Sequence, residues 1–113
     1  MMIHEMKLNA KPFASVKSGE KTVEMRLRDE KRARIKIGDE IHFIHADTGE
    51  VLPCKVVGLY PYESFEDLYR HHDKVSIGYK EDETANPNDM LAYYPAEKIA
   101  KYGVLGIGVE VLK

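Results

Sequence analysis

The sequence predicts a small α+β fold: a barrel-like, mixed but mainly antiparallel sheet of five or six strands, with two or three short helices. Several short segments alternate apolar and polar residues, which is the pattern of strands with one buried face. The segments that suit helices are few and irregularly placed, whereas a doubly wound parallel sheet needs regular alternation of strands and helices. The length of 113 residues is near the commonest size of one domain, so we expect a single domain over residues 1–113.

The first quarter of the chain predicts a strand, a helix and a second strand. Residues 3–8 suit a short strand. Residues 9–19 suit a helix, because Asn9 is a candidate N-cap and Gly19 can end the helix in a left-handed turn. Residues 23–27 then alternate strictly between apolar and polar side chains, which predicts a strand.

The middle of the chain predicts three further strands joined by turns. In order, we expect a short basic strand over 33–37, a Gly38–Asp39 turn, a strand with Ile41 and Phe43 on one face, a hairpin turn over 46–50 and a strand over 51–60. Pro53 cannot donate to a sheet, so it indicates an edge position or a bulge in the last of these strands.

The second half predicts short helices before a closing strand. Ser64 with Asp67 resembles a capping box at the start of a helix. The segment 74–87 is polar and irregular and is the best candidate for a mobile loop, although whether residues 74–86 close over a site stays open. Asn86 before Pro87 suits the start of another helix, and a helix from Pro95 to Gly103 leads into a β-branched strand over 104–111; these are the remaining elements that we expect.

Composition and charge limit the classes of protein. The chain has no apolar run long enough for a signal peptide or a membrane span, so we expect a cytoplasmic protein without a membrane partner. Its single cysteine, Cys54, cannot form an intramolecular disulfide, and we expect it in the core. Residues 17–36 carry eight basic and four acidic side chains, against nine and fifteen in the rest. This patch suits a phosphate-bearing ligand, or alternatively a solvated hairpin whose charges deter aggregation.

The most specific motif lies in the segment SGEKTVEMRLR, residues 18–28. Gly19, Lys21, Glu24 and Arg26 form the pattern G-x-K-x-x-E-x-R at the predicted junction of helix and strand. Glu24 and Arg26 are two residues apart and therefore share one side of the strand. Lysine supplies a compact cation, arginine a planar fork for phosphate or carboxylate, and glutamate an acceptor that can orient either. We expect the three charged side chains to meet in a cleft; the alternative is an exposed ion cluster of little energetic weight.

This motif resembles the signature of the ASCH domain, a branch of the PUA-like β-barrels. A second block, YYPAEKIAKYGVLGIGVEVL, is similar to the C-terminal segment of that family, and the likeness extends from about residue 5 to residue 112. The resemblance implies a PUA-like fold and, as partner, RNA or a nucleotide- or nucleoside-like small molecule. It places Tyr94, Glu97 and Tyr102 beside the motif as further ligand-binding candidates, with the two tyrosines as cleft walls. Exposed tyrosines next to a basic groove can stack on unpaired bases.

The resemblance also implies two enzymatic alternatives. Some small bacterial members of the family are amidohydrolases that deacetylate 4-acetylcytidine with a lysine, a threonine and a glutamate. This sequence retains the lysine as Lys21 but has Glu24 at the threonine position, and Thr22 has the wrong spacing. In such an enzyme Lys21 and Glu24 would be catalytic, with Glu24 as general base for water.

The other enzymatic alternative is a metal-assisted ribonuclease in which Glu24 and Glu97 supply oxygen ligands. The acidic residues show no ligand spacing and the histidines show no zinc pattern, so we expect no metal site and no cofactor. A structural or protein-interaction role remains a further alternative, and the sequence leaves the oligomeric state open.

Overall fold

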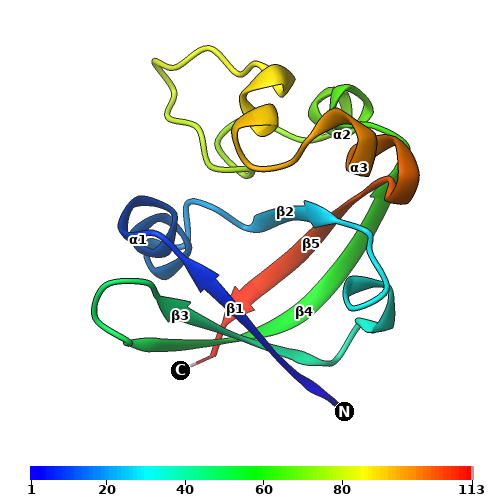
Figure 1. The fold of residues 1–113 in the computed structure, drawn as a ribbon. Helices are drawn as coiled ribbons and strands as arrows, with labels where there is room; N and C mark the ends of the chain where they lie inside the picture. The colour runs from blue at the N-terminus through cyan, green and yellow to red at the C-terminus, as the bar shows by residue number, and fades with distance from the viewer. Residues whose placement is uncertain (113) are drawn as a thin grey trace.

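A computed structural model describes residues 1–112, in which five strands form one sheet (Figure 1). The strands are β1 (Ile3–Leu8), β2 (Val23–Leu27), β3 (Glu40–His45), β4 (Val51–Tyr62) and β5 (Val104–Val111). Their order across the sheet is β1-β3-β4-β5-β2. Only β1 and β3 pair in parallel, and the other neighbours are antiparallel. The sheet curls into a half-barrel, which confirms the predicted small α+β fold (Figure 1).

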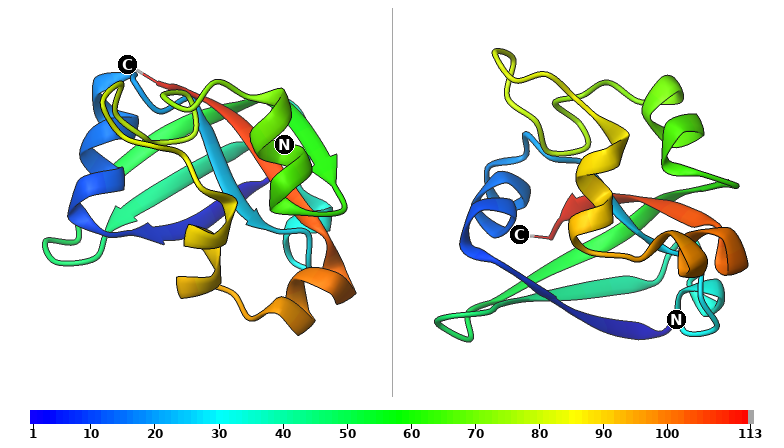
Figure 2. Two further views of the ribbon diagram at one scale, coloured as in Figure 1. Left: turned by 90° about the horizontal axis from the view of Figure 1, so that it is seen from above. Right: turned by 45° about the horizontal axis from the view of Figure 1, so that its top comes forward.

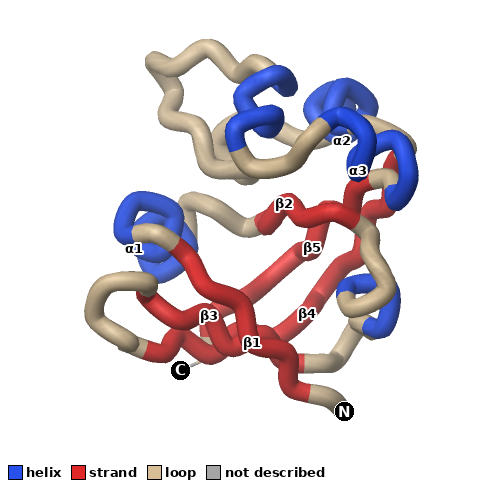
Figure 3. Tube along the Cα trace, in the orientation of Figure 1, coloured by secondary structure: helices blue, strands red, loops and turns tan. Residues whose placement is uncertain are grey.

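The helices are short and lie around the sheet (Figure 3). They are α1 (Ala10–Ser18), α2 (Phe65–His71), α3 (Ala96–Tyr102) and two 3-10 helices, η1 (Arg32–Arg34) and η2 (Pro87–Ala92). Asn9 occupies the N-cap position of α1 without a side-chain capping hydrogen bond, whereas the caps predicted at Ser64 and Asn86 are confirmed. The Ser64 hydroxyl accepts from the Asp67 amide at 3.2 Å, and the Asn86 side chain caps η2 in the same way. Within residues 1–112, no helix combines the length and apolar character needed to span a bilayer.

The apolar residues form two cores, one on each side of β2. The first fills the half-barrel under α1 and includes Phe43 and the buried Cys54, whose pKa burial raises to about 11. The second contains the apolar side of β2 together with Phe65 and Leu68 of α2. It lies between the sheet and the short helices that are drawn above the sheet in Figure 1 and in front of it in the left view of Figure 2. Consequently β2 is covered on both faces, although its alternation predicted one buried and one wet face.

The segment between β2 and β3 differs from the prediction. The expected basic strand over 33–37 is wrong, because the chain forms the 3-10 turn η1 there. Asp29 stabilises this turn, since its carbonyl accepts from the Ala33 amide at 2.8 Å and its carboxylate from the Arg32 amide at 3.0 Å. Ile35 then enters the first core. The charged segment 17–36 is therefore not a hairpin.

Pro53 lies in an inner strand, and the irregularity of β4 occurs between Val56 and Gly58. The proline is tolerated because of the side to which its backbone groups point: its carbonyl accepts from the Leu112 amide, beyond the end of β5. In an extended strand the carbonyl and amide of one residue point the same way, so the missing N–H faces the end of β5 and not β3.

A buried polar contact fastens the start of β1 to the start of β3. The Asp39 carboxylate accepts from His4 Nε2 at 2.9 Å, from the Met2 amide at 3.1 Å and from the Lys36 amide at 3.0 Å. These hydrogen bonds, the His4 bond foremost, lower the pKa of Asp39 to about 2.

Stability should therefore depend on the ionisation of Asp39. The unfolded carboxyl has a pKa of 3.8 and binds protons before the folded one, so its contribution is present above pH 4 and is lost as the pH falls to about 2. We expect urea unfolding to show wild type more stable than Asp39→Asn at pH 6, with the difference shrinking through this interval. A difference that stays constant down to pH 2 would contradict this assignment.

Candidate functional site

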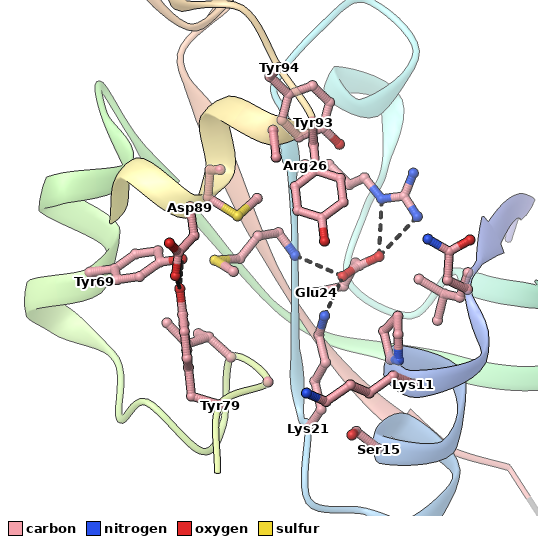
Figure 4. Close-up of a pocket in the computed structure, with 18 of the residues that line it drawn as sticks. Lys11, Ser15, Lys21, Glu24, Arg26, Tyr69, Tyr79, Asp89, Tyr93 and Tyr94 are labelled. Atoms are coloured by element: carbon pink, nitrogen blue, oxygen red, sulfur yellow. Dashed lines mark hydrogen bonds and ion pairs between the residues drawn. The ribbon is translucent and has the colours of Figure 1, made fainter. Parts of the chain in front are cut away.

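A cavity of about 780 Å³ opens beside the polar side of β2. Its other walls come from the end of β1 with α1, and from α2 with the segment between α2 and α3. Of the residues predicted from the sequence, Lys21, Glu24, Arg26 and Tyr94 line it (Figure 4). The structure therefore places the charged motif in a shared hollow.

The local fold brings Lys21 to the cavity floor. Gly19 ends α1 with φ 88°, a left-handed conformation that favours glycine and turns the chain toward β2. The Lys21 amide then donates to the Ser15 carbonyl at 3.0 Å, while the amides of Thr22 and Val23 both donate to the Ser76 carbonyl. As a result the Lys21 side chain is directed inward and only 8% of the residue is exposed.

Glu24 is the centre of the charged cluster and is 4% exposed. Its Oε1 accepts from Lys21 Nζ at 2.9 Å and from the Met25 amide at 3.1 Å. Its Oε2 accepts from Arg26 Nε at 3.1 Å and from Arg26 Nη2 at 2.9 Å. A carboxylate has about four acceptor positions, so these contacts occupy all of them. Glu24 therefore holds the two cations in place, and its oxygens are already engaged.

Arg26 links the two edge strands of the half-barrel. Besides contacting Glu24, its Nη2 donates to the Lys7 carbonyl of β1 at 3.0 Å. β1 and β2 are the first and last strands in the sheet order, so this side chain spans the unclosed edge. The cavity thus lies where a full barrel would have closed.

The protonation states follow from the balance between burial and pairing. Burial alone would raise the pKa of Glu24, but the charges and hydrogen bonds of Lys21 and Arg26 lower it overall. Burial likewise opposes the charge of Arg26, yet Glu24 and then Tyr94 raise its pKa. The cluster of Lys21, Glu24 and Arg26 therefore holds two cations and one anion, with a net charge of +1 at neutral pH.

Two tyrosines form the wall above the cluster (Figure 4). Tyr94 stacks on Phe65 of the second core, with ring centroids 6.2 Å apart and planes 14° apart. Burial raises the pKa of its hydroxyl, which is therefore neutral at physiological pH. Tyr93 also lines the cavity but is 67% exposed, so its ring lies at the mouth and is accessible from solvent.

The remaining two predicted residues lie apart from this cavity. Tyr102 lines a different, more open hollow, together with Arg28 and Lys101. Glu97 is exposed on α3 and is absent from the lining of either hollow. The physical reason is that Pro95 starts a new helix after Tyr94, and this helix leaves Glu97 in solvent and packs Tyr102 against the second core, outside the cavity.

Several lining residues were not singled out from the sequence. Lys7 and Lys11 add positive charge at the side formed by β1 and α1. Gly78 has φ +115°, and a Cβ there would lie 3.3 Å from Lys21 Cδ, so glycine lets the loop pack directly over the Lys21 side chain. Tyr69, Tyr79 and Asp89 line the opposite wall. Of these residues, only Gly78 could have been noticed in the sequence, because a glycine within a polar segment can indicate a positive φ.

Of the residues considered for catalysis or metal binding, Lys21 and Glu24 meet in the cavity, whereas Thr22 and Glu97 lie outside it. Thr22 is exposed and does not line the cavity, so its hydroxyl is not beside the Lys21 amine. Glu97 does not join Glu24. In the described chain, residues 1–112, three or more His, Cys, Asp or Glu side chains nowhere group as a metal site.

A curled five-stranded sheet with a charged cavity beside its N-terminal helix defines this protein as a small half-barrel domain with one candidate site at that cavity. The chain belongs to the ASCH domain family, whose model matches residues 6–113. The crystal structure of hypothetical protein PH0355 is similar, with 31% sequence identity and a TM-score of 0.83 over 99% of this chain and 100% of that one.

The solution structure of protein PF0455 from Pyrococcus furiosus is also similar to this chain. The identity is 31% and the TM-score 0.77, over 99% of both chains. A search of curated proteins finds no match. The predicted family is confirmed, and both structural comparisons cover essentially the whole fold.

Proposed function

We propose that the protein binds nucleotides, either free or as an unpaired nucleotide of single-stranded RNA, in the cavity beside β2. The observation that carries this proposal is the buried cluster of Lys21, Glu24 and Arg26 on the floor of a tyrosine-lined hollow. Membership of the ASCH family supports the proposal, because RNA is the general class of partner that this family implies.

Stability does not explain why the cluster is buried. Removing charges from water is costly, and a well-packed apolar substitute for a buried ion pair is often equally stable or more stable. The cluster instead has hydrogen-bond donors that Glu24 does not use, on residues that line the cavity. Lys21 has three N–H groups, and one of them is directed to Glu24; the bonds of Arg26 within residues 1–112 run through Nε and Nη2. Donors on two cations suit a phosphate or a carbonyl oxygen.

The size and walls of the cavity suit a nucleotide. Small-molecule sites usually occupy about 300–1,000 Å³, a range that includes the 780 Å³ of this hollow. The residues that line it include four basic ones, Lys7, Lys11, Lys21 and Arg26, against three acidic ones. Tyr93 offers an exposed ring at the mouth on which a base can stack.

The geometry favours binding over hydrolysis. A general base works best when its pKa lies near the working pH, and the pKa of Glu24 is lowered. Both of its oxygens are also occupied by Lys21, Met25 and Arg26. Glu24 is therefore better suited to holding the two cations than to activating water.

Lys21→Met should weaken binding of 5′-AMP, 5′-CMP and single-stranded RNA about 10- to 100-fold, the equivalent of one or two charged hydrogen bonds. The variant should remain folded, because Glu24 keeps Arg26 as its partner. Fluorescence anisotropy with labelled oligonucleotides, and calorimetry with nucleotides, measure the change. Affinity for RNA should also fall with the logarithm of salt, with a slope of about −0.7 per phosphate contact.

Lys17→Met is the matched control. Lys17 is an exposed lysine of α1 that pairs with Glu50 at 2.6 Å, away from the cavity. The Lys17→Met variant should bind nucleotides and RNA as tightly as wild type. Equal losses in the two variants, or no binding of any nucleotide or RNA by wild type, would overturn the proposed function.

A further inference from the structure

The wall opposite the cationic cluster carries a chain of hydroxyl groups that ends in a carboxylate (Figure 4). Tyr69 Oη lies 2.9 Å from Tyr79 Oη, and Tyr79 Oη lies 2.7 Å from Asp89 Oδ2. Tyr69 comes from α2, Tyr79 from the loop that follows it, and Asp89 from η2. All three residues line the cavity.

The direction of each hydrogen bond in this chain is fixed by Asp89. An ionised carboxylate can only accept, so the Tyr79 hydroxyl donates to it. Tyr79 has one proton, and therefore Tyr69 must donate to Tyr79. The Asn86 carbonyl, 3.2 Å from Tyr79 Oη, is the more distant acceptor. Burial raises the pKa of both tyrosines, so the two hydroxyls keep their protons at neutral pH.

This wall therefore presents hydrogen-bond acceptors to the cavity, whereas the floor presents hydrogen-bond donors. The remaining acceptors are a lone pair of Tyr69 Oη and the second oxygen of Asp89, since the hydroxyl protons are used within the chain. The side chains of Lys21, just before β2, and of Arg26 on β2 carry N–H donors only. The cavity thus has a donor side and an acceptor side, and a ligand that fills it must present the complementary groups in that order.

We infer that the ligand carries a base with an exocyclic amino group, which donates to Asp89 while phosphate or carbonyl oxygens of the ligand accept from Lys21 and Arg26. This inference rests on the proposed function and adds the class of base. Adenine and cytosine have an amino group at this edge, whereas uracil and hypoxanthine present an oxygen there. An oxygen facing the Asp89 carboxylate would leave two acceptors without a proton between them, which disfavours the oxo bases.

Matched nucleotide pairs test the inference directly. Calorimetry should show wild type binding CMP more tightly than UMP, and AMP more tightly than IMP, by about tenfold, the effect of one hydrogen bond to a charged group. Asp89→Asn has the same shape but offers an amide, which can donate to an oxygen or accept from an amine. It should bring both ratios close to one. Asp89 is exposed on η2, so this variant should fold normally.

Tyr79→Phe provides a second variant that acts through Asp89. It removes the hydroxyl that orients the carboxylate, and it should lower the amino-to-oxo ratio without the loss of affinity for all nucleotides that Lys21→Met produces. Equal binding of amino and oxo nucleotides by wild type, or a preference that Asp89→Asn retains, would overturn this inference and leave the proposed function standing. Failure of wild type to bind any of the four nucleotides would overturn both.

Discussion

Glu24→Ala should lower the free energy of unfolding by about 3–5 kcal/mol, because it leaves two buried cations without their shared counter-ion. Lys21 and Arg26 both contact this carboxylate at 2.9 Å, and the side chains are 9% and 15% exposed. Without Glu24 they would repel each other in a partly desolvated hollow. Urea unfolding at neutral pH measures the loss, which is a large fraction of the stability expected for a domain of this size.

Removing either cation provides the control. Lys21→Met or Arg26→Met each leaves a one-to-one pair with Glu24, so both should cost clearly less than Glu24→Ala. A loss below about 1 kcal/mol for Glu24→Ala would mean that the cluster behaves like an exposed ion pair. The contrast also separates roles, since Lys21→Met should reduce binding while preserving most of the stability.

The cluster could be predicted from the sequence because its members are close in the chain. Strand alternation places Glu24 and Arg26 on one side, and Gly19 fixes the turn that brings Lys21 to the same region. These are local constraints, and local rules capture them. The alternation predicted that this side of β2 would be wet, however, and it is largely buried because α1 and the loop after α2 pack around it.

The opposite wall could not be predicted in this way. Tyr69, Tyr79 and Asp89 are separated by ten residues at each step, and the intervening loop has no periodicity. They meet because the buried Ile77 holds the loop in the second core and Ser76 hydrogen-bonds the start of β2. The predicted lack of regular structure in 74–87 was right, yet this loop is tied to the sheet at one end of the cavity.

The misplaced strand over 33–37 has a similar origin. Its composition satisfies a strand, but Asp29 makes local hydrogen bonds to the backbone and the Arg32 guanidinium that favour a turn. In contrast, the family resemblance identified Tyr94 as a cavity residue even though no periodicity placed it there. Its position depends on stacking against Phe65, which lies 29 residues earlier in the sequence.

That stack makes Phe65→Ala a test of whether the second core supports the cavity wall. Phe65 is 2% exposed, and truncating a buried phenylalanine to alanine typically costs 3–5 kcal/mol, so we expect a loss of about that size in urea unfolding. Tyr94 would also lose the ring that fixes its orientation. In conditions where the variant remains folded, nucleotide affinity should therefore fall about two- to tenfold, the range expected from one aromatic contact.

Phe43→Ala is the matched comparison, since Phe43 is fully buried in the first core, inside the half-barrel. Its truncation should cost a similar free energy of unfolding and leave the affinity of the folded protein close to wild type. If both variants lose affinity equally, the cavity depends on the rigidity of the whole domain and not on the Phe65–Tyr94 contact. If only Phe65→Ala does, then the helices over β2 and β5 act as the support of the binding wall, and the half-barrel supplies the charged floor.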